Sequence, residues 1–138
     1  MACVSAGYSG TPLAKKLGIT QGSRVLTIGA PPELESWLKP LPADVRISTR
    51  IRSADVALVF AITEADMRKR VPRAVNALPV DGAMWLCWPK KASGIASPLQ
   101  RRDTVMGYMT TLGLVDIKVA AVSEVWSGLK WVIRRELR

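Results

Sequence analysis

The sequence predicts one α/β domain with a mostly parallel sheet, helices on both faces and an antiparallel hairpin at the C-terminal end. Two unbroken apolar runs, Val56–Ile62 and Ala83–Trp88, are typical of strands that are buried on both faces of a parallel sheet. Segments with helical signals alternate with such strands, and this alternation implies right-handed crossovers. The chain has 138 residues, 49% of them hydrophobic, and can bury a core of its own. We therefore expect a single domain over residues 1–138.

Local signals predict four elements in the N-terminal third. Thr11 is a suitable N-cap, Pro12 is a suitable first helical residue, and Gly18 ends the helix that they begin. The expected elements are a helix over 12–17, a strand over 24–29, a helix over 32–37 and a candidate strand over 45–49. The segment between this last strand and the next is too short for a crossover helix. Either the chain crosses there in extended form, or the two strands are not parallel.

The remaining elements complete the alternation. Thr63 and Asp66 resemble a capping box and open a helix to about Leu78, which Pro72 should kink or split. Apolar residues at helical spacing predict another helix over 97–113. The last two strands are expected over 115–121 and 129–135, and their connection over 123–128 is short enough for a hairpin.

The composition favours some functions and excludes others. The net charge of +9 favours anionic partners, namely nucleic acid, an acidic protein or a phosphorylated small molecule. Because there is no histidine, Ser-His and Cys-His catalytic pairs and histidine-containing zinc sites are excluded. The two cysteines supply neither a four-thiolate metal site nor a disulfide framework, which fits a reducing cytoplasm. We expect a cytoplasmic protein with no metal and no membrane partner, since no apolar run is long enough to span a bilayer.

A Ser-Gly pair occurs three times, at 9–10, 93–94 and 127–128, each time near lysine. Glycine lets backbone N–H groups turn outward, serine adds a hydroxyl and lysine adds charge, a combination that can hold an anion. If the last two pairs meet at the carboxyl edge of the sheet, they form an anion pocket with Trp88 and Trp126 as walls. The expected ligand-binding residues are Lys90, Lys91, Ser93, Gly94, Trp126, Ser127, Gly128 and Lys130. The alternative is a set of independent turns flanked by solvated lysines.

Other basic residues have two interpretations. Arg50 and Arg52 could grip a phosphate bidentately, or could flank an edge strand and discourage unwanted pairing. The run Arg68-Lys69-Arg70 with Arg73 is interpreted as a solvated helix face, because consecutive residues diverge around a helix.

Three segments resemble parts of the class I methyltransferase fold, a Rossmann-like sheet that ends in an antiparallel hairpin. They are 24–29, 78–85, and 112–115 with 130–132. The resemblance implies that S-adenosylmethionine would lie on a glycine turn after the first strand, with an acidic residue at the end of the second. Here Gly29 is followed by Pro31 and Pro32, which remove two backbone donors, and residues 48–50 include no acid. We therefore expect that no cofactor is bound.

A longer resemblance rests on the opening GYSGTPLAKKLGI over 7–19, together with Trp88-Pro89-Lys90-Lys91 and Trp126-Ser127-Gly128-Leu129-Lys130. These segments resemble a family of small bacterial proteins classified as a domain of unknown function. The resemblance implies a bacterial cytoplasmic protein and carries no assigned activity.

These observations favour a non-catalytic binding module that has lost the S-adenosylmethionine site and binds an anionic small molecule or phosphate group at the carboxyl edge of the sheet. One alternative is an enzyme of the same fold, with Glu124 or a lysine as proton carrier. Another is a basic nucleic-acid or ribosome-associated protein whose binding depends on charge.

Overall fold

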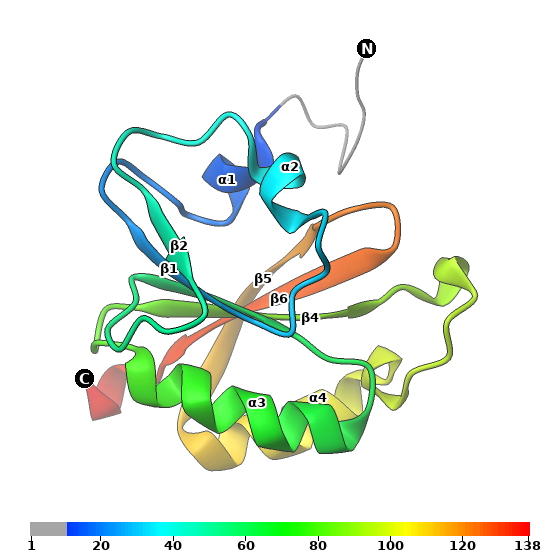
Figure 1. Cartoon of the computed structure of the whole chain (residues 1–138). Helices are drawn as coiled ribbons and strands as arrows, with labels where there is room; N and C mark the ends of the chain where they lie inside the picture. The colour runs from blue at the N-terminus through cyan, green and yellow to red at the C-terminus, as the bar shows by residue number, and fades with distance from the viewer. Residues whose placement is uncertain (1–10) are drawn as a thin grey trace.

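The computed structural model describes residues 11–138, in which six strands form one sheet in the order β2-β1-β3-β4-β6-β5 (Figure 1). The strands are β1 (Arg24–Ile28), β2 (Arg46–Ser48), β3 (Val56–Phe60), β4 (Ala83–Pro89), β5 (Leu114–Ala121) and β6 (Trp126–Ile133). The pairs β2–β1, β1–β3 and β3–β4 are parallel, whereas β4–β6 and β6–β5 are antiparallel. The predicted fold class is confirmed.

Helices cover both faces of this sheet. The α-helices are α1 (Leu13–Lys16), α2 (Leu34–Leu38), α3 (Glu64–Ala77) and α4 (Arg102–Met109). Short 3-10 turns are η1 (Lys91–Ser93), η2 (Pro98–Gln100), η3 (Thr110–Leu112) and η4 (Arg135–Leu137). In Figure 1, α3 and α4 lie along one face, while α1 and α2 lie on the other.

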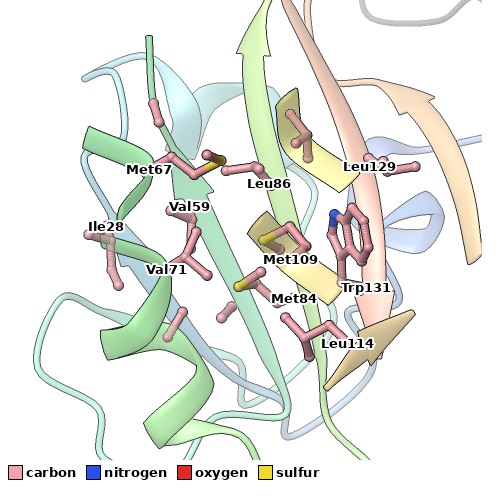
Figure 2. Packing of buried hydrophobic residues seen from close by; sticks show 14 of the residues in the cluster. Ile28, Val59, Met67, Val71, Met84, Leu86, Met109, Leu114, Leu129 and Trp131 are labelled. Carbon is pink, nitrogen blue, oxygen red and sulfur yellow. The ribbon is translucent and has the colours of Figure 1, made fainter. Parts of the chain in front are cut away.

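The core consists of two apolar clusters, one on each face. The first cluster joins Met67 and Val71 of α3, and Val105 and Met109 of α4, to inward residues of the strands (Figure 2). The second cluster joins α1 and α2 to the opposite face and contains Trp85, whose indole Nε1 donates to the Leu17 carbonyl oxygen at 3.0 Å. Burial of these apolar side chains is the main stabilising contribution to the fold.

The segment between β2 and β3 crosses in non-helical form, as one of the two predicted possibilities requires. Both strands pair with β1 in parallel, so the chain passes over β1 on its way from one to the other. Ile51 packs against the first cluster, which places this crossing on the face covered by α3. The other possibility, that the two strands are not parallel, is wrong.

Three expectations about individual elements also differ from the structure. β6 begins at Trp126 rather than Leu129, because the Ser123 hydroxyl accepts from the backbone N–H groups of Val125 at 3.1 Å and Trp126 at 3.0 Å and so closes a tight turn. Pro72 does not split α3, which runs unbroken over 14 residues. The helix expected over 97–113 is divided into η2, α4 and η3.

The cap predicted for α3 is confirmed. Thr63 precedes the helix, and its hydroxyl oxygen accepts from the backbone N–H of Asp66 at 3.0 Å. The cap fixes where α3 begins relative to the end of β3, and therefore which side chains of α3 reach the carboxyl edge of the sheet.

Candidate functional site

The register between β4 and β6 separates the residues of the predicted anion pocket. Trp88 lies opposite Ser127, and Pro89 lies opposite Trp126. Directly paired residues share a face of the sheet, and successive residues point to opposite faces. Trp88 accordingly packs against the first cluster, while Trp126 packs against the second and meets the Phe60 ring edge-on at 5.1 Å between centroids. The two tryptophans cannot be walls of one pocket, and this expectation is wrong.

Lys130 lies far from the other predicted lysines. It is paired with Trp85, five positions before Lys90, which corresponds to about 16 Å along a strand. Lys130 instead lines a cavity of about 400 Å³ at the amino edge of the parallel strands, together with Gly18 and Asp55. Partial burial and the neighbouring Lys118 ammonium lower the pKa of Lys130. The expectation that Lys130 meets Lys90 at one rim is wrong.

The loop after β4 forms a compact turn of its own. The backbone N–H of Lys90 donates to the Val125 carbonyl oxygen at 2.8 Å, which ties this loop to the hairpin turn. The Ser93 hydroxyl donates to the Lys90 carbonyl oxygen at 2.6 Å and accepts from Ile95 N–H at 3.1 Å. Gly94 ends the turn with a φ of 82°. The Ser93 hydroxyl therefore closes the turn that follows β4.

Some of the predicted residues do remain neighbours at the carboxyl edge. Lys90, Lys91, Ser93 and Gly94 form the loop after β4, and Trp126 begins the strand paired with the end of β4. Ser127 and Gly128 continue that strand on opposite faces. Anion binding by these residues stays a prediction. The first Ser-Gly pair, Ser9-Gly10, lies outside the described residues.

An arginine occupies the space between the carboxyl ends of β1 and β3. Gly29 follows β1 with a φ of 69°, and the Arg70 side chain of α3 packs directly against it. A Cβ atom at Gly29 would lie 2.8 Å from Arg70 Cζ and 2.9 Å from the Phe60 carbonyl oxygen. Arg70 Nη1 donates to that same carbonyl at 2.7 Å, and its Nη2 lies 3.7 Å from the Asp66 carboxylate.

Arg70 was not distinguished by the sequence, because it belongs to a run of basic residues. Side chains of a helix tilt toward its N-terminus, so Arg70 reaches back from α3 to the end of β3. The one local signal was Asp66, four residues earlier on the same face. The solvated-face interpretation is wrong for Arg70, whose half-buried side chain donates to the Phe60 carbonyl oxygen. The same interpretation covers Arg68, whose guanidinium carbon lies 4.7 Å from the Tyr108 ring centroid.

A cavity of about 320 Å³ adjoins this edge near β1 and β2. Its lining includes Gly29, the two prolines that follow Ala30, and Thr49. Its one carboxylate comes from Glu35 of α2. The methyltransferase resemblance implies an acid at the end of the second strand and therefore does not point to Glu35, which belongs to the next helix along the chain from β1.

Other chemistry is sparse in the described part of the chain. Residues 11–138 contain no group of three or more acidic, cysteine or histidine side chains placed to hold a metal ion. Burial raises the pKa of the Cys87 thiol, so it is held in its poorly nucleophilic neutral form. Glu124 is exposed in the hairpin turn and takes no part in the three ion pairs found in this part of the chain. No helix there has the length and apolarity that a bilayer span requires.

Comparison with known proteins supports the fold. No family model matches the sequence, and no curated protein matches it. Among solved structures, a complex of DhpI with SAH is similar with a TM-score of 0.59 and 10% identity, over 90% of this chain and 83% of the other. An SAM-dependent methyltransferase from Thiobacillus denitrificans in complex with S-adenosyl-L-homocysteine gives a TM-score of 0.56 and 12% identity, over 92% of each chain.

The N-methyltransferase NodS from Bradyrhizobium japonicum gives a TM-score of 0.53 and 11% identity, over 89% of this chain and 88% of the other. The chain has a class I methyltransferase-like fold. At these identities the similarity concerns the fold alone, because one fold carries many functions. The resemblance to small bacterial proteins of unknown function stays a prediction.

Proposed function

We propose that the protein is a non-catalytic binding module of methyltransferase-like fold, which holds an anionic ligand in place of S-adenosylmethionine. One observation carries the proposal. The Arg70 guanidinium lies on Gly29, at the glycine turn where the methyltransferase resemblance expects the cofactor.

The surroundings of Arg70 support this interpretation. A cofactor at the glycine turn would have to displace Arg70 from the Phe60 carbonyl and from its ion pair with Asp66. Pro31 and Pro32 offer no backbone N–H groups to a ligand there. The end of β2 carries Ser48 and then Thr49, so no strand-end acid is available for ribose hydroxyls. The residues present do not fit S-adenosylmethionine in the usual arrangement of the fold.

The charge distribution supports an anionic ligand. The chain has 20 lysine and arginine residues against 11 acidic ones. Only three ion pairs form within residues 11–138, so most of the cations there have no carboxylate partner. Lys90 and Lys91 are such cations, at the carboxyl edge where open α/β sheets bind ligands.

Calorimetric titration tests the proposal directly. S-adenosyl-L-homocysteine and pyrophosphate are titrated separately into the wild-type protein and into Arg70→Ala. We expect saturable pyrophosphate binding to the wild type, and no saturable binding of S-adenosyl-L-homocysteine up to about 1 mM. Specific binding of S-adenosyl-L-homocysteine to the wild type would overturn the proposal, as would the absence of pyrophosphate binding.

A second candidate is an enzyme of methyltransferase-like fold, favoured by the cavity that contains Glu35. A carboxylate from α2 could accept hydrogen bonds from ribose hydroxyls in place of an acid on β2. If this candidate is correct, the wild type binds S-adenosyl-L-homocysteine and Glu35→Gln weakens that binding about tenfold or more. The binding-module proposal instead expects that S-adenosyl-L-homocysteine does not bind to the wild type at all.

A further inference from the structure

Three arginines surround a cavity of about 430 Å³ between α3 and the crossing that joins β2 to β3. Its lining residues are Leu26, Arg50, Ile51, Arg52, Arg73, Asn76 and Ala77. The lining includes no aspartate or glutamate. This cavity lies on the α3 face of the sheet and shares no lining residue with the cavity beside Gly29.

The fold explains why these arginines gather. Ile51 packs into the first cluster as the chain passes over β1, which places Arg50 and Arg52 on either side of it. Arg73 faces this crossing from α3, and its Nη2 donates to the Thr49 carbonyl oxygen. Residues three and four apart share one face of a helix, so Asn76 and Ala77 line the same cavity as Arg73.

The three guanidinium groups lack compensating charge. The ion pairs in the described part of the chain involve Arg24, Arg70 and Arg102, and none involves an arginine of this cavity. Cations gathered around one space repel one another, most strongly at low ionic strength. A bound anion would remove this repulsion, and planar guanidinium groups match phosphate oxygens bidentately.

The rest of the lining indicates what the anion carries. Leu26 and Ala77 are buried and apolar, and Asn76 adds one amide donor and acceptor. An apolar floor beneath a cationic rim suits a molecule with a planar or apolar body and a phosphate group. The volume lies within the usual range for small-molecule sites, about 300–1,000 Å³. A long single-stranded nucleic acid would instead need an extended basic groove with stacking aromatics.

We propose that this cavity binds a phosphorylated small molecule of the nucleotide class, with its phosphate on Arg50, Arg52 and Arg73. The inference rests on the proposed function only in requiring an anionic ligand. This site lies on the α3 face and is separate from the loop after β4 that carries Lys90 and Lys91.

ADP, adenosine and a 12-nucleotide single-stranded RNA are the probes for a calorimetric test. We expect saturable ADP binding to the wild type and at least tenfold weaker adenosine binding, because adenosine lacks the phosphates. The double variant Arg50→Ala/Arg52→Ala should weaken ADP binding by about a hundredfold, a factor of ten for each lost charge-assisted contact. Arg73 is left unchanged because its contact with Thr49 also supports the crossing.

The matched control is Lys69→Ala/Arg134→Ala, which removes the same net charge from exposed positions outside the cavity. It should leave ADP affinity within about twofold at 150 mM salt, where distant surface charges are screened. Circular dichroism and urea unfolding verify that each variant is folded. Equal weakening by both double variants would overturn the site, because net charge alone would then explain the binding.

The absence of ADP binding to the wild type would also overturn it. If the RNA then binds tightly with a steep salt dependence, the arginines form a nucleic-acid surface instead. The two proposals are tested by different results. Binding of S-adenosyl-L-homocysteine to the wild type would overturn the proposed function, whereas the arginine site is tested by the change in ADP affinity in Arg50→Ala/Arg52→Ala.

Discussion

Replacing Gly29 with alanine tests whether the space above this residue is filled by Arg70. Two costs are expected. Gly29 has a φ of 69°, a conformation that costs an L-residue about 1–2 kcal/mol. The new Cβ would also lie 2.8 Å from Arg70 Cζ and 2.9 Å from the Phe60 carbonyl oxygen. Relieving such overpacking costs about 1–3 kcal/mol.

The matched control is Gly22→Ala. Gly22 has a φ of 77°, but among residues 11–138, its two chain neighbours aside, no atom lies within 4 Å of the position that its Cβ would take. It should therefore show the backbone cost alone, about 1–2 kcal/mol, while Gly29→Ala should cost about 2–5 kcal/mol. Urea unfolding followed by circular dichroism gives both free energies of unfolding.

A double-mutant cycle isolates the contribution of Arg70. In an Arg70→Ala background, one of the two obstacles to the new methyl group is removed, so Gly29→Ala should cost at least about 0.5 kcal/mol less. The Phe60 carbonyl remains in place and should keep part of the cost. If Gly29→Ala costs no more than Gly22→Ala, or if the cycle gives no coupling, Arg70 does not fill this space.

Two further predictions concern the two faces of the sheet. Trp85→Phe should destabilise the protein by about 1–3 kcal/mol more than Trp131→Phe in urea unfolding, because it leaves the Leu17 carbonyl oxygen without its donor. Trp131→Phe breaks no such hydrogen bond, since the Trp131 indole N–H has no partner among residues 11–138. Equal losses of unfolding free energy would contradict this prediction. Lys118→Gln should raise the pKa of Lys130, measured by NMR of its side-chain ammonium, because a neighbouring charge is removed. Because the pKa of Lys130 is lower in the folded protein than in the unfolded chain, the unfolded chain keeps this proton to higher pH. The free energy of unfolding therefore rises with pH between the folded pKa and 10.5, and Lys118→Gln should reduce that rise. An unchanged pKa of Lys130 in the variant would contradict this reasoning.

The sequence predicted the elements of the fold because their signals are local. Continuous apolar runs identified β3 and β4, and these strands are indeed buried on both faces. The pairing of Thr63 with Asp66 correctly predicted the start of α3. These signals depend on neighbours within a few positions, where propensity and capping act directly.

The site was predicted less well because its geometry depends on register. Moving the start of β6 from Leu129 to Trp126 takes Lys130 from the hairpin tip to the middle of a strand. Whether two side chains on neighbouring strands share a face depends on the pairing register. One residue more or fewer in the turn shifts that register and moves every side chain of the strand to the other face. The contact of Arg70 with Gly29 joins residues that are 41 positions apart, and no local pattern indicates such a contact.

Titration of S-adenosyl-L-homocysteine into the wild-type protein, followed by calorimetry, tests most directly whether Arg70 has replaced the cofactor at the glycine turn. We predict no saturable heat up to about 1 mM ligand. A one-to-one complex of micromolar affinity that Glu35→Gln weakens would contradict the account, because the ligand would then occupy the carboxyl edge despite Arg70.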